Sequence, residues 1–231
     1  MPTRSLALAF SHGAVTLLAE HSLSKRKMKD SKIISRILRL DKNIYNELLV
    51  QKDSLQKSIF IYLTTSVLLT LGVFRFINGV LDFIKENLMA FQQELSTQEF
   101  SMIRSLIDEL EVAFNSENAF SNIISSITSS VISSGIGLVI IYFVLKYLLR
   151  QESQPKNLLI IYCYSNIPGL LIAPTFVISS IFVQGVLVTF VAVFSIVTFG
   201  SGLKQVYSLR NIEVILLLVS WMFGSTILGS I

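Results

Sequence analysis

Long runs without a charged side chain dominate the pattern of this chain. No Asp, Glu, Lys or Arg occurs over residues 118–145, and none occurs over residues 157–203. A helix that crosses a bilayer needs about 20 apolar residues, so the first run holds one such helix and the second holds two. The pattern therefore predicts an all-α, polytopic membrane protein.

The hydropathy pattern predicts five membrane-spanning helices in a membrane domain over residues 58–231. The longer charge-free run would extend about 70 Å as one helix, which is too long for one crossing. We therefore expect a turn inside it, at Gln184-Gly185. The five predicted spans cover residues 58–80, 119–145, 158–183, 186–203 and 213–231.

A basic, amphipathic segment precedes the first span, over residues 28–57. Its apolar residues recur at the three- and four-residue steps of one helical face: Ile33, Ile37, Leu40, Ile44 and Leu48. We expect a helix in the plane of the lipid headgroups, because the cations that flank this face suit anionic lipid. The alternative is a helix that packs on the cytoplasmic ends of the spans. The flanking cations are Lys32, Arg36, Arg39 and Lys42.

An acidic insertion lies between the first two spans, over residues 82–117. Ser96-Thr97-Gln98-Glu99 has the pattern of a capping box. Apolar stripes before and after it predict two short helices that form a hairpin. An acidic face of this kind either gathers a basic partner or, more commonly, is simply solvated.

Charge alternates along the chain as five spans require. Residues 1–57 hold 11 Lys or Arg against 5 Asp or Glu, whereas residues 82–117 hold 2 against 8. The loops 146–156 and 204–213 also carry more cations than anions. Because cytoplasmic loops are enriched in Lys and Arg, the N-terminus is predicted inside, the acidic insertion outside and the C-terminus at the outer face.

The composition supports a lipid environment. The chain is 52% hydrophobic and 15% charged, whereas soluble proteins carry about 25% charged residues. The net charge of +4 is concentrated near the predicted membrane surface, so anionic headgroups are expected as partners and nucleic acid is not. Residues 1–27 are expected to be a disordered tail, or an extension that precedes a translation start at Met28, because cleavage as a signal peptide would export the basic segment.

Six small residues of the second span predict close packing between helices. Side chains of this size at four-residue steps let two helices approach, and their hydroxyl groups bond across the contact. A hydrophilic pore lining is the alternative, but the other spans offer no matching polar residues. The six are Ser125, Ser129, Ser130, Ser133, Ser134 and Gly137.

The third span is predicted to break at Tyr164, Asn166, Pro168, Gly169 and Pro174. Each proline removes a backbone donor and bends or interrupts the helix. Broken helices create ion or substrate sites in some transporters. We favour a structural irregularity here, because Asn166 is the only amide-bearing side chain nearby.

Residues that carry chemistry are few, and no enzyme is expected. His12 and His21 lie in the doubtful first segment, so a zinc site lacks its ligands. Cys163 is the only cysteine, which excludes a thiolate cluster. Arg75 and Asp82 share a helical face near the outer interface, where they either pair or reach the interface separately. We expect no catalytic residue, no metal and no cofactor.

Three stretches of the chain resemble the Yip-domain family, the membrane proteins that interact with Ypt and Rab GTPases, and their prokaryotic relatives. They are ILRLDKNIYNEL at residues 37–48, YCYSNIP at residues 162–168 and LKQVYSL at residues 203–209. The resemblance covers residues 33–80 and 138–231 in pattern and order. The family's glycine ahead of the third-span tyrosine is not present here, and the insertion is longer than in many relatives.

The resemblance implies a five-helix bundle with a cytosolic N-terminus, in the cell membrane if the protein is prokaryotic. Eukaryotic members of the family shape or traffic membranes, and prokaryotic members have no settled role. Our first hypothesis is a non-enzymatic scaffold, adaptor or membrane-organising protein, which binds itself or other membrane proteins by helix association. The acidic-aromatic motif of the eukaryotic members is missing, which argues against binding of a small GTPase. The alternative is a small transporter or channel, with a polar path between the broken third span and the serine-rich second span.

Overall fold

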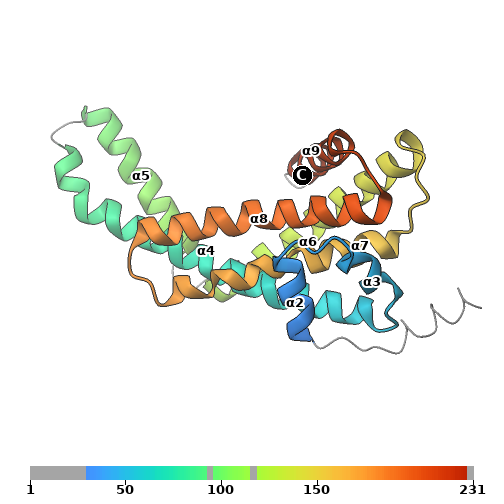
Figure 1. Cartoon of the computed structure of the whole chain (residues 1–231). Coiled ribbons are helices and arrows are strands. Elements are labelled where there is room, and N and C mark those ends of the chain that lie inside the picture. The colour runs from blue at the N-terminus through green and yellow to red at the C-terminus, as the bar shows by residue number, and fades with distance from the viewer. Residues whose placement is uncertain (1–29, 93–95, 115–118, 228–231) are drawn as a thin grey trace, which may run out of the picture.

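The computed structural model describes residues 30–92, 96–114 and 119–227 (Figure 1), and these residues contain helices and loops but no strand. The expectations for residues 1–27 lie outside them. The elements are α2 (Asp30–Leu38), α3 (Ile44–Val50), α4 (Ser54–Gln92), α5 (Thr97–Phe114), α6 (Ala119–Phe143), the π-helical turn η1 (Val144–Leu148), α7 (Pro155–Ser165), the 3-10 helix η2 (Ile167–Phe176), α8 (Ile181–Tyr207) and α9 (Asn211–Ile227).

The predicted all-α class and the predicted membrane character are both supported. In the part of the chain that the structure describes, four helical stretches are long and apolar enough to cross a membrane: Ser54–Leu88, Ser121–Leu148, Pro155–Phe176 and Ile181–Tyr207. α9 is apolar but has only 17 described residues. The described length of α9 therefore does not establish the predicted fifth span over residues 213–231.

The α7–η2 stretch forms the centre of the bundle. Of its apolar window, 67% is buried, against 11–22% for the other three stretches. It packs between α4 and α8, while α9 packs against α6. Figure 1 shows α4 and α8 running along the length of the molecule, with α9 toward one end and α6 running from the middle to that end. Most of the surface of α4, α6 and α8 is thus left to face lipid.

α4 and α5 form the acidic hairpin, but α4 is longer than expected. The apolar stripe predicted as a separate short helix before Ser96 continues the first span into one helix of 39 residues. The capping box is confirmed, since the Ser96 N–H donates to Glu99 Oε2 at 3.0 Å and the Glu99 N–H donates to Ser96 Oγ at 3.3 Å. Lys85 of α4 forms an ion pair with Glu111 of α5. These contacts fold α5 back along α4.

The turn expected at Gln184-Gly185 lies earlier, at residues 177–180. Gly185 belongs to α8, where a Cβ atom would lie 3.1 Å from the ring of Phe76. The glycine therefore allows α8 to approach α4 and does not end a helix. Gln184 is buried, and its amide Nε2 donates to the carbonyl oxygen of Ile178 at 2.6 Å. This bond links the first turn of α8 to the residues that precede the helix.

The in-plane arrangement of the N-terminal segment is not confirmed, because the protein itself covers its apolar face. Ile33, Ile37, Ile44 and Leu48 are each at most 1% exposed and belong to the main hydrophobic core. α3 contacts α8, α7 and α4. The segment therefore packs on the bundle, as in the alternative interpretation. The amphipathic pattern predicts the apolar face correctly. It does not show whether lipid or protein covers that face.

Polar contacts gather the N-terminal segment and two loops at one end of the bundle. The Gln205 side-chain amide donates to the carbonyl oxygen of Asp41 at 3.0 Å. The hydroxyl groups of Ser153 and Tyr207 lie 3.4 Å apart. The α4–α5 hairpin lies at the opposite end (Figure 1). α3 and the two basic loops are thus separated from the acidic hairpin by the length of the bundle, whereas α2 lies beside η2, nearer its middle.

Candidate functional site

The third span changes helix type within the stretch where the sequence predicts a break. α7 ends at Ser165, and a 3-10 helix begins at Ile167, with Pro168 in its first turn. Side chains satisfy the backbone next to the break: Asn166 Nδ2 and Ser165 Oγ both donate to the carbonyl oxygen of Tyr162, at 2.8 and 2.6 Å. Tyr164 and Pro168 are buried. These residues fill the centre of the bundle.

Two glycines allow the 3-10 helix to pack tightly on α4. A Cβ atom at Gly169 would lie 3.1 Å from Thr65, and one at Gly72 would lie 2.5 Å from Ile172. Pro174 lies inside the same 3-10 helix and is exposed. The break is therefore a packing device, and its residues do not line a path through the bundle.

Only some of the six small residues predicted to pack helices contact other helices of the same chain. Gly137 faces the indole ring of Trp221 in α9, and Ser134 is buried and accepts a hydrogen bond from the Tyr162 hydroxyl at 2.6 Å. Ser133 is half-buried. The other three, Ser125, Ser129 and Ser130, are exposed on α6 and are called the serine face below.

The break and the serine face do not lie opposite each other. η2 packs against α4 and α8, whereas the serine face points away from the bundle. α6 instead contacts α7, the part of the third span before the break, through the hydrogen bond between Tyr162 and Ser134. The described residues therefore do not form the polar path that a transporter interpretation requires.

Arg36 differs from the other three predicted membrane-surface cations. Its Nε donates to Asp41 Oδ2 at 2.8 Å, and its Nη atoms donate to the two carboxylate oxygens of Glu47 at 2.6 and 2.7 Å. Hydrogen bonds with Glu47 and Asp41 raise the pKa of Arg36. Arg36 thus joins α2 to α3. Lys32, Arg39 and Lys42 are exposed and can face headgroups.

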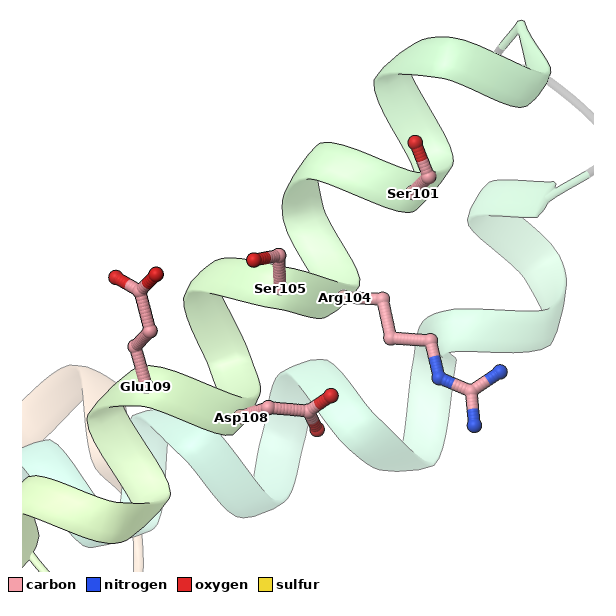
Figure 2. Close-up of a pocket in the computed structure, with 5 residues that line it drawn as sticks. All are labelled: Ser101, Arg104, Ser105, Asp108 and Glu109. Atoms are coloured by element: carbon pink, nitrogen blue, oxygen red, sulfur yellow. The ribbon is translucent and has the colours of Figure 1, made fainter.

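A recess on α5 is the first candidate site outside the predicted sets. It has a volume of about 560 Å³ and is lined by Ser101, Arg104, Ser105, Asp108 and Glu109. Figure 2 shows that one helix supplies all five side chains and that Glu109 points away from Arg104 and Asp108. Because no second element contributes, the groups do not converge on a ligand. This recess is a solvated helix surface.

A second cavity, of about 610 Å³, lies where α4, the end of η2, the start of α8 and the start of α6 meet. Arg75 and Asp82 line it, and they do not form an ion pair with each other. Arg75 Nε instead donates to the carbonyl oxygen of Thr175 at 2.9 Å. Asn78, Ser179 and Gln184 also line this cavity. Below it is called the polar pocket.

The sequence indicated only part of the polar pocket. The seven-residue spacing of Arg75 and Asp82 placed them on one face of a helix. Gln184 was instead interpreted as part of a turn, and Ser179 lay inside the predicted third span. Their position beside Arg75 depends on where α8 begins, at Ile181, which hydropathy alone does not indicate.

No group of three or more His, Cys, Asp or Glu side chains that could hold a metal occurs among the described residues. Comparisons with protein-family models, with curated proteins and with solved structures give no match to this chain. The Yip-domain assignment therefore rests on the resemblance of the three stretches alone.

Proposed function

We propose that this chain is a non-enzymatic integral membrane protein that acts as a scaffold or adaptor by associating with a second copy of itself. The serine face of α6 carries this proposal. Ser125, Ser129 and Ser130 are exposed on an apolar helix, where lipid offers a hydroxyl group no hydrogen-bond partner beyond its own helix. A second copy of the same face supplies such partners.

The serine face is self-complementary. A serine hydroxyl both donates and accepts a hydrogen bond, and a two-fold symmetric contact brings the same surface of both copies together. Each interhelical hydrogen bond in a membrane contributes about 0.6 kcal/mol, and small side chains add close backbone contact. Ser125 and Ser129 lie one turn apart at the centre of this face and Ser130 lies at its edge, so the face suits a reversible association.

We further propose five-span threading with the N-terminus in the cytoplasm and the acidic hairpin outside. The cation excess of the N-terminal segment and of the two short loops supports this orientation, as does the separation of α3 and these loops from the hairpin along the bundle. Lys32, Arg39 and Lys42 then lie near anionic headgroups at the cytoplasmic surface. The predicted fifth span over residues 213–231, which includes α9, then ends at the outer face.

The likeness to the Yip-domain family supports the same class of function. The resembling stretches include the break of the third span, which the bundle uses for packing on α4. On this proposal the protein is a Yip-like, prokaryotic cell-membrane protein without a small-GTPase partner. The transporter alternative has weaker support, because the break and the serine face lie apart.

Cysteine crosslinking in membranes tests the association. In a Cys163→Ser background, Ser129→Cys is expected to form a disulfide-linked dimer on oxidation, because equivalent residues meet near the two-fold axis. Thr64→Cys is the control, since Thr64 is an exposed hydroxyl residue on α4. Adding Ser125→Leu to the Ser129→Cys chain should reduce the dimer several-fold. Equal crosslinking at positions 64 and 129 would contradict the proposal.

A further inference from the structure

We infer that the polar pocket binds the headgroup of an aminophospholipid, a phosphate ester that also carries a positively charged amine. The inference goes beyond the scaffold function and rests on the proposed threading, in which α4 enters the membrane near Ser58 and leaves it at the outer face. The pocket sets hydrogen-bond donors for an anion beside acceptors for a cation. Its residues come from four elements that the fold of the bundle brings together.

The anion-binding side consists of Arg75 and the start of α8. Arg75 uses Nε to donate to the carbonyl oxygen of Thr175, and its Nη atoms make no hydrogen bond within the described chain, so they remain for a bidentate bond to phosphate oxygens. α8 starts at Ile181, which lines the pocket, and the side chain of Ser180 does not cap it. The N–H groups of its first turn and its dipole favour a negative charge, and the contact between Ile181 and Gly79 places this turn between the levels of Arg75 and Asp82.

The cation-binding side consists of Asp82 and Gln184. The side chain of Gln184 is 3% exposed, and its Oε1 accepts no hydrogen bond from the described residues. A buried acceptor without a donor is costly, so a donor from a ligand would be favourable there. Asp82 lines the same pocket and adds a carboxylate. An ammonium group supplies both the positive charge and the N–H donors that these two residues lack.

Depth in the membrane selects a lipid over a soluble ligand. At 1.5 Å per residue, Arg75 lies about 26 Å along α4 from Ser58 and Asp82 about 36 Å. The hydrocarbon core is about 30 Å thick, so with the core starting at Ser58, the predicted start of the first span, the two residues lie on either side of its outer boundary. In an aminophospholipid the phosphate is nearer the hydrocarbon than the amine, which is the order of Arg75 and Asp82. Leu71 and Phe74 line the deeper side of the pocket, where acyl chains would lie.

Native mass spectrometry of the detergent-purified chain, titrated with phosphatidylethanolamine or phosphatidylglycerol, tests the inference. The unmodified chain should bind phosphatidylethanolamine more tightly. Arg75→Gln should weaken the binding of both lipids at least tenfold. Asp82→Asn should remove the preference while retaining phosphatidylglycerol. The matched controls Arg104→Gln and Asp108→Asn, which change exposed charges on α5, should leave binding unchanged.

Three results would overturn the inference. The first is equal binding of the two lipids by the unmodified chain. The second is unchanged binding by Arg75→Gln or an unchanged preference in Asp82→Asn; if Arg75→Gln does not fold, Asp82→Asn alone decides. The third is displacement of the lipid by soluble phosphoethanolamine at an equal concentration, which would identify a soluble ester as the ligand. Loss of the crosslinked dimer affects none of these results, so the inference and the scaffold proposal fail separately.

Discussion

The hydroxyl group of Tyr45 donates a hydrogen bond to the backbone carbonyl oxygen of Thr198, at 3.3 Å, across 153 residues of sequence. Tyr45 is 2% exposed, and its ring lies 3.1 Å from where a Cβ atom at Gly202 would be. The glycine thus makes room for the tyrosine in α8. This contact attaches the N-terminal segment to the bundle.

Removal of this hydroxyl group should loosen the N-terminal segment. Tyr45→Phe is expected to lower the free energy of unfolding by about 1 kcal/mol, because a buried carbonyl loses its donor. Tyr45→Ala should lower it by about 3–5 kcal/mol, since a cavity is added. Thermal unfolding in detergent measures both. The control is Tyr147→Phe, which changes a tyrosine that is 67% exposed. Equal effects at positions 45 and 147 would show that the segment is not docked.

The contact between α6 and α9 gives a second prediction, with a control in the same helix. A Cβ atom at Gly137 would overlap the Trp221 ring, whereas one at Gly135 meets no atom within 4 Å. Gly137→Ala should therefore destabilise the protein by about 1–3 kcal/mol through overpacking. Gly135→Ala should be neutral or stabilising by up to about 1 kcal/mol, because alanine favours a helix. Paired melting curves decide, and a reversed order would refute this packing.

The cluster formed by Arg36, Asp41 and Glu47, called the Arg36 cluster, predicts a loss of stability in acid. Hydrogen bonds from the Arg36 guanidinium and from the Asn43 N–H lower the pKa of the Asp41 carboxyl in the folded protein. The ionised cluster therefore stabilises the fold above the ordinary Asp pKa of about 4. This stabilisation is lost as the pH falls through the lowered folded-state pKa.

Unfolding midpoints between pH 7 and pH 2 measure this dependence. Asp41→Asn should have a lower midpoint than the unmodified chain at pH 7, and the two midpoints should converge in acid. Asp108→Asn is the control, because Asp108 is exposed on α5, and it should follow the unmodified chain throughout. A constant difference between Asp41→Asn and the unmodified chain at every pH would exclude an electrostatic origin.

The capping box predicts local protection of α5. Ser96→Ala removes the hydroxyl group that accepts from the Glu99 N–H and should cost about 1 kcal/mol of local helix stability. Hydrogen exchange of the first turn of α5 should rise about fivefold. Ser105→Ala, in the middle of α5, should leave exchange in that turn unchanged. Equal exchange in both variants would mean that the box does not hold the helix end.

The sequence predicts the helices of this fold better than their partners. Charge-free runs locate the apolar stretches because a helix in lipid needs a minimum length. The stripe from Ile33 to Leu48 was recognised as one helical face, but lipid and protein offer that face the same apolar contact. Only the three-dimensional fold shows that η2 covers the part of this stripe in α2 and that α4, α7 and α8 cover the part in α3.

The turn between α7–η2 and α8 shows a second limit. The length of the charge-free run predicts a turn near its middle, at Gln184-Gly185, yet Gly185 lies inside α8 and provides space for Phe76. Small residues in membrane helices have both uses, and their spacing does not separate them. The sequence does not predict the polar pocket either, because the position of the pocket depends on the residue at which α8 begins.

The side of the membrane on which each end of the bundle lies is the most direct test of the account. In a Cys163→Ser background, Asp108→Cys on α5 and Lys42→Cys before α3 place one thiol at each end, and both parent residues are exposed. A membrane-impermeant maleimide applied to intact cells should label Asp108→Cys, and it should label Lys42→Cys only after the membrane is opened. Labelling of both positions from the same side would contradict the threading, and with it the assignment of the polar pocket to the outer boundary.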